Sequence, residues 1–352
     1  MERPSLLAML PEDLATHLQT RGVTVRPTDA RRVLAHVIAD GHDDLGTKAN
    51  LPRRVREAVD AHTRRDRPAL EARVPSSEDG GVRYLFRFRD GRAAEAVRIP
   101  LARPGCFTVC LSSQVGCAMK CDFCATGRLG LTRNLDADEI VGTFLHVRDE
   151  VRADGGRVTG AVFMGQGEPL HNYDAVIRAA RVLSDPCGGR IDARAITIST
   201  VGLVPQIRRY TAEGHRYRLI VSLTSAVPER RARLVPVAGR TPLPELMDAV
   251  RAHQAATGDR QTLAWVLLGG ENDGPDEVDA LRDLVADLPI RLNLIDVNDA
   301  RPDGYRRASD PERDAFLDAL QVLRAPIVRR FSVGRDEHAA CGMLAARLQA
   351  AD

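Results

Sequence analysis

The stretch CLSSQVGCAMKCDFC, residues 110–124, contains four of the seven cysteines of this 352-residue chain. Within it, Cys117, Cys121 and Cys124 follow the spacing C-x3-C-x2-C. Three thiolates on one short loop can bind three corners of an iron–sulfur cube and leave the fourth iron free to chelate a small molecule. Zinc is the alternative occupant, because it needs four ligands and could recruit Cys110 or a histidine.

The rest of the sequence indicates a reducing environment for these thiols. The N-terminal MERPSLLAML is too short and too charged for a secretory signal, and no apolar run approaches the ~20 residues of a membrane span. We therefore expect a cytoplasmic protein without a membrane partner, in which clustered cysteines serve metal or redox chemistry. Outside the cluster, Cys106 is close enough in sequence to Cys110 for thiol exchange, and Cys187 and Cys341 stand alone.

A second candidate site is the glycine-rich stretch MGQGEPLHN, residues 164–172. Gly165 and Gly167 allow the backbone to approach a ligand closely, and Glu168 can accept a hydrogen bond from a bound ammonium group. A glycine-rich turn after a strand is as often structural as functional, so its meaning depends on the cysteine loop.

Apolar strands alternate with amphipathic helices from about residue 106 onward. Near-continuous apolar strands of this kind predict a parallel sheet covered by helices. Six or seven such units favour an α/β fold with a complete or partial (β/α) barrel, whose chemistry gathers at the C-terminal ends of the strands. The cysteine loop follows the first of the predicted strands, which are CFTVCLS, GAVFMG, AITIST, YRLIVSL, TLAWVLLGG, RLNLIDV and PIVRRFSVG.

Two smaller parts precede the barrel. Residues 1–75 show helical periodicity and no strand pattern, and DARRVLAHVIADG places Val33, Leu34 and Val37 on one helix face. In residues 76–104, alternating side chains and an Asp90-Gly91 turn predict a β-hairpin. We therefore expect a small helical accessory domain over 1–75, a hairpin extension over 76–104 and the barrel over 105–352.

Five motifs in this order resemble the RlmN/Cfr family of radical-SAM RNA methyltransferases, where SAM is S-adenosylmethionine. The resemblance runs from about residue 85 to the end and implies a [4Fe–4S] cluster on Cys117, Cys121 and Cys124, with SAM as the second cofactor. It also implies RNA (rRNA, tRNA or both) as the partner, and an electron donor such as flavodoxin or ferredoxin. We further expect a monomer. The motifs are CLSSQVGCAMKCDFCATGRLGLTRNL, FMGQGEPLHNY, ITISTVGLVPQIRR, NLIDVN and DEHAACGML.

The resemblance also assigns roles to two further thiols and one carboxylate. Carbons 2 and 8 of adenine are not nucleophilic, so they cannot take a methyl group directly from SAM. Cys341, in AACG, matches a cysteine that carries the methyl group as S-methylcysteine, and Cys110 matches the resolving cysteine, which forms a transient disulfide with Cys341. Two SAM molecules are used per turnover. Glu95 matches a candidate proton acceptor, although its strand position suits a surface ion pair equally well. Without the resemblance, a lone AACG cysteine is typical of a buried small residue.

The implied SAM contacts include two departures from the family pattern. Thr224, in SLTSAV, stands where the family usually has histidine, and DVNDA adds Asp296 and Asp299. Both changes fall on loops expected to face the cavity, which indicates an altered substrate side and a diverged paralogue. The residues that match SAM contacts are Gly167, Glu168, Ser199, Ser222, Leu223, Thr224 and Asn298.

These observations lead to one main functional hypothesis and two alternatives. The main hypothesis is methylation of an sp2 carbon of adenosine in RNA, carbon 2 in preference to carbon 8. Arginines such as Arg83, Arg87 and Arg89 could hold the RNA backbone, although such runs are usually solvated faces, and the formal net charge is only +2. The alternatives are the same chemistry on a small nucleoside or a peptide, and a non-catalytic RNA-binding module that carries a cluster or zinc.

Overall fold

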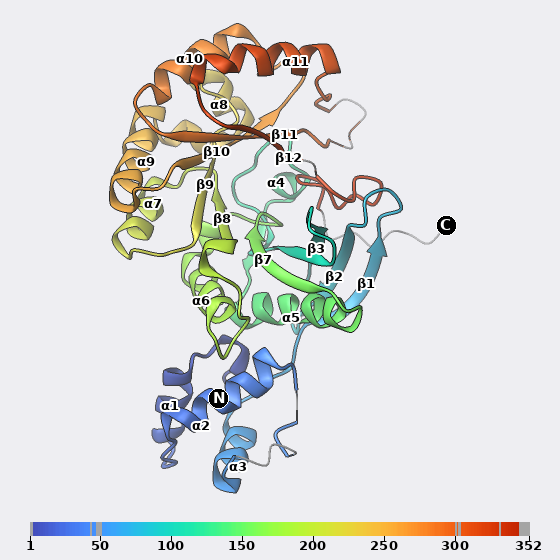
Figure 1. Cartoon of the computed structure of the whole chain (residues 1–352), viewed down its shortest axis with the longest axis vertical. Coiled ribbons are helices and arrows are strands. Elements are labelled where there is room, and N and C mark those ends of the chain that lie inside the picture. The colour runs from blue at the N-terminus through green and yellow to red at the C-terminus, as the bar shows by residue number, and fades with distance from the viewer. Residues whose placement is uncertain are drawn as a thin grey trace.

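The computed structural model describes residues 3–42, 44–46, 51–299, 301, 304–330 and 332–344. At one end of the molecule, below the barrel in Figure 1, lies a lobe of short helices. Val33, Leu34 and Val37 are buried in this lobe, as their periodicity predicts. Its elements are η1 (Leu6–Ala8), α1 (Pro11–Gln19), α2 (Pro27–Leu34), the π-helical turn η2 (Ala35–Ala39) and α3 (Arg53–His62).

A ten-stranded open sheet forms the centre of the molecule, in the order β1-β2-β3-β4-β7-β8-β9-β10-β11-β12. From β4 onward every neighbouring pair is parallel. This confirms the predicted partial barrel, because β12 and β4 are not paired. The parallel strands are β4 (Cys106–Leu111), β7 (Arg157–Phe163), β8 (Ile196–Thr200), β9 (Arg218–Ser222), β10 (Gln261–Leu267), β11 (Ile290–Asp296) and β12 (Ile327–Arg330).

The antiparallel extension has three strands rather than the two of the predicted hairpin. They are β1 (Ala69–Pro75), β2 (Val82–Arg87) and β3 (Ala93–Pro100), and β3 pairs with β4. The helical part therefore ends at His62, earlier than the predicted boundary at residue 75. The sequence pattern did not predict β1, because this strand lies at the edge of the sheet, is largely exposed and shows no apolar alternation.

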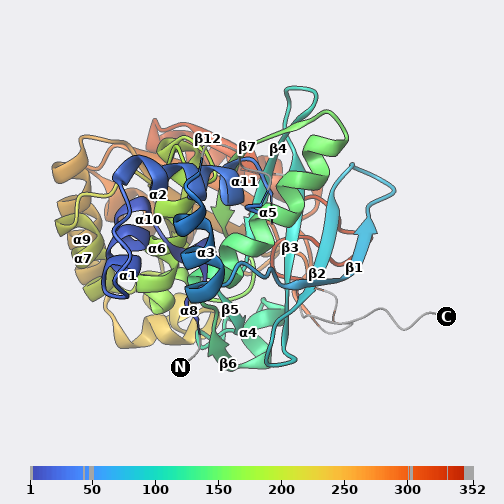
Figure 2. The ribbon, with the colours of Figure 1, turned by 90° about the horizontal axis from the view of Figure 1, so that it is seen from below.

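Helices cover the outer side of the parallel sheet. In Figure 2 the strands β1 and β2 lie on one side of the molecule, and α7 and α9 lie on the opposite side. Within the described residues, no helix is both long enough and apolar enough to cross a bilayer. The main covering helices are α5 (Ala137–Ala153), α6 (Tyr173–Ser184), α7 (Val204–Ala212), α8 (Pro228–Leu234), α9 (Leu243–Thr257), α10 (Pro275–Val285) and α11 (Asp310–Ala319).

Short elements between β4 and α5 shape the cysteine loop. The strands β5 (Gln114–Gly116) and β6 (Leu131–Asn134) form a small separate ribbon, and the short helix α4 (Ala125–Leu129) lies between them. The turns η3 (Pro169–Asn172), η4 (Ala193–Ala195), η5 (Pro236–Arg240) and η6 (Leu320–Leu323) complete the described elements.

Candidate active site

The three cysteines of the C-x3-C-x2-C motif lie on the loop between β5 and α4, and all three line one cavity. The backbone holds this loop closely: the amide of Cys117 donates to the carbonyl of Gly130 at 2.9 Å. A Cβ atom at Gly127 would lie 2.8 Å from the backbone nitrogen and oxygen of Cys121. Only glycine therefore allows α4 to pack this tightly against the cysteine loop.

The chemistry of this donor set fits an iron–sulfur cube. Burial raises the pKa of Cys117 to about 12 and that of Cys121 well above its ordinary value, and the nearby thiol of Cys124 raises both further. A cationic metal centre reverses this preference and stabilises the thiolates. Within the described residues, no three His, Cys, Asp or Glu side chains surround one point as ligands of a single ion would. The thiolates of a cube need not do so, since each binds a different iron.

The opposite wall of the cavity is built from the C-terminal ends of the parallel strands. Glu168 follows β7, Ser199 lies in β8, Ser222 ends β9 and Asn298 follows β11, and all four line the cavity together with Gly167. Polar side chains from four strand ends thus meet beside the three thiols, as the barrel rule predicts.

The carboxylate of Glu168 is buried and partly satisfied by backbone amides. One oxygen accepts from the amide of Leu170 at 3.0 Å and the other from the amide of Val201 at 2.9 Å. Burial nevertheless raises its pKa to about 7. A bound ammonium group would offset that desolvation, because an adjacent positive charge favours the ionised carboxylate.

The glycines of the GQGEP stretch serve the packing of the chain itself. Gly167 has φ +103°, and a Cβ atom there would lie 2.6 Å from the Cβ atom of Gln114. At Gly165 it would lie 2.8 Å from the hydroxyl of Ser112. Both glycines thus allow close packing against the segment after β4, which carries the cysteine loop, and both also line the cavity.

Two of the seven residues matched to SAM contacts do not line the cavity. Leu223 and Thr224 are fully buried just beyond β9. Thr224 has φ +63°, which is unusual for a β-branched residue, and its hydroxyl has no hydrogen-bond partner among the described residues. The residue that replaces the usual histidine thus stands behind the wall of the cavity.

Sequence reasoning missed Arg231, a buried arginine of α8. Its guanidinium donates to the carbonyls of Val201 and Leu223, and so ties the loops after β8 and β9 together. Burial lowers its pKa to about 10, and Cys121 partly offsets that effect. Nothing in PERRARL distinguishes this arginine from its neighbours, because its partners come from distant strand ends.

The segment that carries Cys341 is fastened to the cysteine loop. The amide of Ala125, directly after Cys124, donates to the carbonyl of Gly342 at 2.7 Å. The hydroxyl of Thr126 donates to the carbonyl of Leu344 at 2.6 Å, and Asn298 donates from its side-chain amide to the carbonyl of Cys341 at 3.3 Å. Cys341 lines the same cavity as the three cluster cysteines.

The segment that carries Cys341 contacts both sides of the site: Gly342 accepts the amide that follows Cys124, and Ala339 and Leu344 share an apolar cluster with Cys110. Burial raises the pKa of Cys110 to about 12 with a further contribution from Cys341, and burial raises the pKa of Cys341 to about 11 with a contribution from Cys124. Cys341 is exposed and lines the cavity. All seven cysteines are free thiols in this structure. Cys106 occupies the other end of β4, roughly 13 Å along the strand from Cys110, so these two cannot exchange directly.

Glu95 lies on β3 and is buried in an ion pair. Its carboxylate contacts Arg83 at 2.7 Å, and both side chains are almost fully buried. Arg83 pairs across the sheet with Val97, and Val97 with Cys110, so this ion pair lies on the same sheet face as Cys110. Glu95 does not line the cavity. The expectation that Arg83 grips RNA is wrong, because β2 is buried on both faces here.

The two additional aspartates have different surroundings. Asp296 lines the cavity and pairs with Arg329 at 2.9 Å. The side chain of Asp299 is fully buried and pairs with Arg301 at 2.7 Å, with Arg128 further away at 3.8 Å. The carboxylate of Asp299 therefore pairs with arginines beside the cysteine loop and does not line the cavity.

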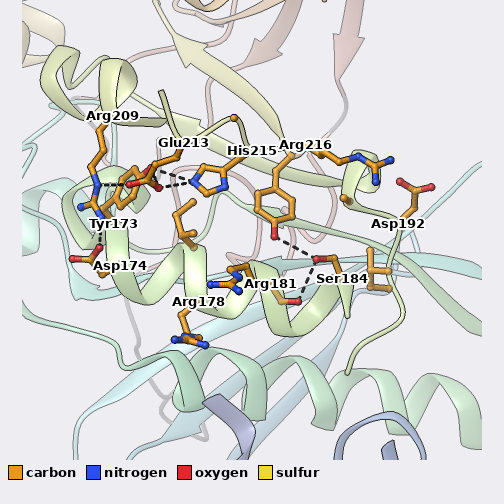
Figure 3. A pocket seen from close by; sticks show the side chains of 15 residues that line it. Tyr173, Asp174, Arg178, Arg181, Ser184, Asp192, Arg209, Glu213, His215 and Arg216 are labelled. Atoms are coloured by element: carbon orange, nitrogen blue, oxygen red, sulfur yellow. Dashed lines mark hydrogen bonds and ion pairs between the residues drawn. The ribbon is translucent and has the colours of Figure 1, made fainter. Parts of the chain in front are cut away.

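A larger cavity, of about 920 Å³, lies elsewhere, along α6 and the loop before β9. Figure 3 shows its side chains: Tyr173, Arg209 and His215 converge on Glu213, whose carboxylate accepts from Tyr173 at 2.8 Å and from Arg209 at 2.7 Å. No cysteine lines it. Arg209 pairs with both Asp174 and Glu213, and this cavity shares no lining residue with the one beside the cysteine loop.

Comparison with known proteins agrees with this geometry. The model of the Radical SAM superfamily matches residues 111–285. A probable RNA methyltransferase of Anaeromyxobacter sp. (strain Fw109-5) is 50% identical over 97% of this chain and 99% of its own length. The dual-specificity RNA methyltransferase RlmN of Syntrophobacter fumaroxidans is 39% identical over 93% of this chain and 94% of its own length. A crystal structure of a radical SAM methyltransferase from Sphaerobacter thermophilus superposes with a TM-score of 0.89 at 35% identity, covering 98% of this chain and 100% of that one.

The fold and the site thus define an enzyme of the radical SAM class, with a [4Fe–4S] cluster and SAM as its cofactors. More narrowly, the chain belongs to the RlmN/Cfr family of radical SAM RNA methyltransferases.

Proposed function

We propose that this enzyme methylates carbon 2 of an adenosine in rRNA, tRNA or both, through a methyl group carried on Cys341. The observation that carries the proposal is the position of the Cys341 segment: Cys341 lines the cavity with the three cluster cysteines, and Ala339 and Leu344 of the same segment pack in one apolar cluster with Cys110. A carrier must reach both the cofactor side and the resolving thiol. Cys341 meets that requirement because its segment is hydrogen-bonded to α4 directly after Cys124.

In this proposal each residue of the site has a distinct task. Cys117, Cys121 and Cys124 hold the cluster, which with SAM supplies the hydrogen-atom abstraction that activates the carried methyl group. Gly167, Glu168, Ser199, Ser222 and Asn298 hold SAM. Leu223 and Thr224 support the Ser222 loop from behind the cavity wall. The sulfur of Cys341 first attacks the methyl carbon of one SAM; the new sulfur–methyl bond forms as S-adenosylhomocysteine leaves, and the thiol proton passes to solvent.

Release of the product falls to Cys110. Its thiolate attacks the sulfur of Cys341, and the bond between that sulfur and the methylene carbon on the base breaks. The methylene carbon keeps the electron pair and takes a proton to become the methyl group, which leaves a Cys110–Cys341 disulfide. That disulfide must be reduced to two thiols by an external dithiol, which is itself oxidised to a disulfide, before the next turnover. Glu95 is the candidate acceptor of the ring proton, and Arg83 holds its carboxylate on the sheet face that carries Cys110. The enzyme acts as a cytoplasmic monomer.

The test uses two single substitutions on the same strand. Cys110→Ala removes the resolving thiol, so a covalent enzyme–RNA adduct should accumulate and be detected as a shifted band that ribonuclease removes. Cys106→Ala, at the opposite end of β4, should turn over normally. Wild-type activity on an RNA with which the Cys110 variant forms no adduct would contradict the role of Cys110.

Mass spectrometry of nucleosides from cells with and without the gene identifies the product. We expect loss of 2-methyladenosine from rRNA, tRNA or both in cells without the gene. Loss of 8-methyladenosine would move the target to carbon 8. The alternative of a small nucleoside or peptide substrate has lost one support, because the carboxylate of Asp299 is buried in an ion pair and does not face the cavity.

A further inference from the structure

The cysteine loop has an outer face as well as the inner face that lines the cavity. Lys120, Arg128, Leu129 and Leu131 are exposed, and none of them lines the cavity. We call these four residues the outer face. Leu129 and Leu131 are 50% and 37% exposed, which places them among the few large apolar side chains that are open to solvent in the described part of the chain. The two leucines flank Gly130 at the junction of α4 and β6, and both are open to solvent.

The contacts of the loop place this outer face directly behind the cluster cysteines. Gly130, between the two leucines, accepts the amide of Cys117 at 2.9 Å. Lys120 is bonded to Cys121, and α4 packs against the backbone of this pair at Gly127. A molecule that touches the outer face is therefore separated from the cysteines by little more than one layer of backbone.

The charge of the outer face is positive. Lys120 makes no hydrogen bond or ion pair with the described residues, and its backbone has φ +56°. Arg128 donates to the backbone carbonyl of Asp122 at 2.8 Å and lies 3.8 Å from the carboxylate of Asp299, but it remains exposed. The carboxylates of Asp122 and Asp299 are engaged by Tyr305 and Arg301. Cations beside exposed apolar side chains are complementary to an acidic protein surface with an apolar centre.

We propose that the outer face docks the protein that reduces the cluster, an acidic one-electron carrier with a flavin or iron–sulfur centre. The inference rests on the proposed function, because only a cluster that must be reduced needs such a partner. In the docked complex the carrier loses one electron and the cluster gains it, and no bond forms or breaks. Because the electron reaches the cluster from the outer face of the loop, the cavity stays available to SAM and substrate. RNA suits this face less well, because phosphate contacts require cations and gain nothing from two exposed leucines.

The unusual composition of the chain allows a direct test on the wild-type holoenzyme. Lys48 and Lys120 are its only lysines. A carbodiimide joins lysine amines to carboxylates in contact with them, so reduced flavodoxin, used as the probe, should be linked through Lys120. Peptide mass spectrometry identifies the linked amine. Linkage only through Lys48 or the N-terminal amine would overturn the proposal.

A kinetic test separates docking from catalysis. The triple variant Lys120→Gln, Leu129→Ser, Leu131→Ser should slow cluster reduction by flavodoxin at least about tenfold, while reduction by dithionite, which needs no docking surface, stays unchanged. The control is Leu70→Ser with Leu101→Ser, which removes two other exposed leucines. Equal flavodoxin rates in the triple variant and the wild type would overturn the proposal, as would a loss of RNA affinity with an unchanged flavodoxin rate. Neither readout requires RNA methylation, so failure of the proposed function is seen separately.

Discussion

Asp299 shows how one residue outside the cavity can hold the cluster loop. Its carboxylate accepts from Arg301 at 2.7 Å and from the amide of Tyr305 at 3.3 Å. These two residues in turn hold Asp122, between Cys121 and Cys124: the Tyr305 hydroxyl donates to its carboxylate at 2.8 Å, and Arg301 donates to its carbonyl at 3.2 Å. Asp299, which departs from the family pattern, thus stabilises the cysteine loop through Arg301 and Tyr305.

Replacement of Asp299 by asparagine tests this role. Asp299→Asn keeps the size of the side chain and removes its charge, so the partly buried Arg301 loses its charge-assisted hydrogen bonds. We expect the free energy of unfolding to fall by about 1–3 kcal/mol, as for other hydrogen bonds to charged groups. Denaturant titration measures the change, and iron analysis should show faster loss of the cluster.

The matched control is Asp310→Asn, whose carboxylate is 83% exposed in its pair with Arg313. It should change the free energy of unfolding by less than about 0.5 kcal/mol. Equal effects of the two substitutions would show that Asp299 is an ordinary surface residue.

At the scale of residues, the sequence predicts what is local. The spacing of Cys117, Cys121 and Cys124 is a property of one loop, so it could be recognised without the fold. The roles of Arg231 and Asp299 depend on partners from distant strand ends, which no local pattern reveals. Thr224 shows a further limit: it follows Ser222 by two residues, but it has a left-handed backbone and does not line the cavity.

At the scale of elements, the antiparallel extension supports the segment that carries Cys341. The carboxylate of Asp336 accepts from the hydroxyl of Ser76 at 2.8 Å and from the amide of Ser77 at 2.9 Å, both in the turn between β1 and β2. Asp79 of the same turn accepts from the amide of Gly334 at 2.7 Å. The extension thus helps to hold the C-terminal segment, while no residue of β1, β2 or β3 lines the cavity.

Loss of this link should slow loading of the carrier. Asp336→Ala removes the hydrogen bonds to Ser76 and Ser77, so Cys341 should be methylated several-fold more slowly while the visible absorbance of the cluster stays unchanged. Timed peptide mass spectrometry of Cys341 measures the rate. Glu78→Ala, in the same turn, is the control because no side-chain contact of Glu78 is seen in the described part of the chain. The same rate in both variants would show that the turn does not position the segment.

The element pattern also explains which parts of the fold were predictable. Seven apolar strands separated by amphipathic helices gave the partial barrel, since parallel strands buried on both faces read as continuous apolar runs. The third strand of the extension was missed because β1 is an exposed edge with charged side chains. Arg83 was expected at the surface, but β2 is buried on both faces, and its charge is neutralised by Glu95.

At the scale of the whole molecule, arginines hold the helical lobe to the barrel. Arg178 pairs with Asp13 at 2.5 Å, and Arg64 pairs with Asp138 at 2.7 Å. Arg64 and its neighbours at the end of the lobe therefore serve partly as structural ties. With 50 basic and 48 acidic residues, RNA binding must come from local patches rather than from overall charge.

Salt dependence tests whether such patches bind RNA. Release of counterions from phosphates makes affinity fall as salt rises, with a slope set by the number of phosphates contacted. For three or more contacts, RNA affinity should fall more than about tenfold between 50 and 200 mM salt. Fluorescence anisotropy of labelled RNA measures this, and SAM affinity under the same conditions is the control. A flat response would argue against RNA and favour a small substrate.

The most direct test of the central claim is peptide mass spectrometry of Cys341 after the reconstituted enzyme has been incubated with SAM whose methyl group is isotopically labelled. The account predicts one labelled methyl group on the sulfur of Cys341 in the wild type and none on any cysteine of Cys341→Ala, whose cluster absorbance should be unchanged. A labelled methyl group on another cysteine, or an unmodified Cys341 in enzyme that methylates its substrate, would contradict it.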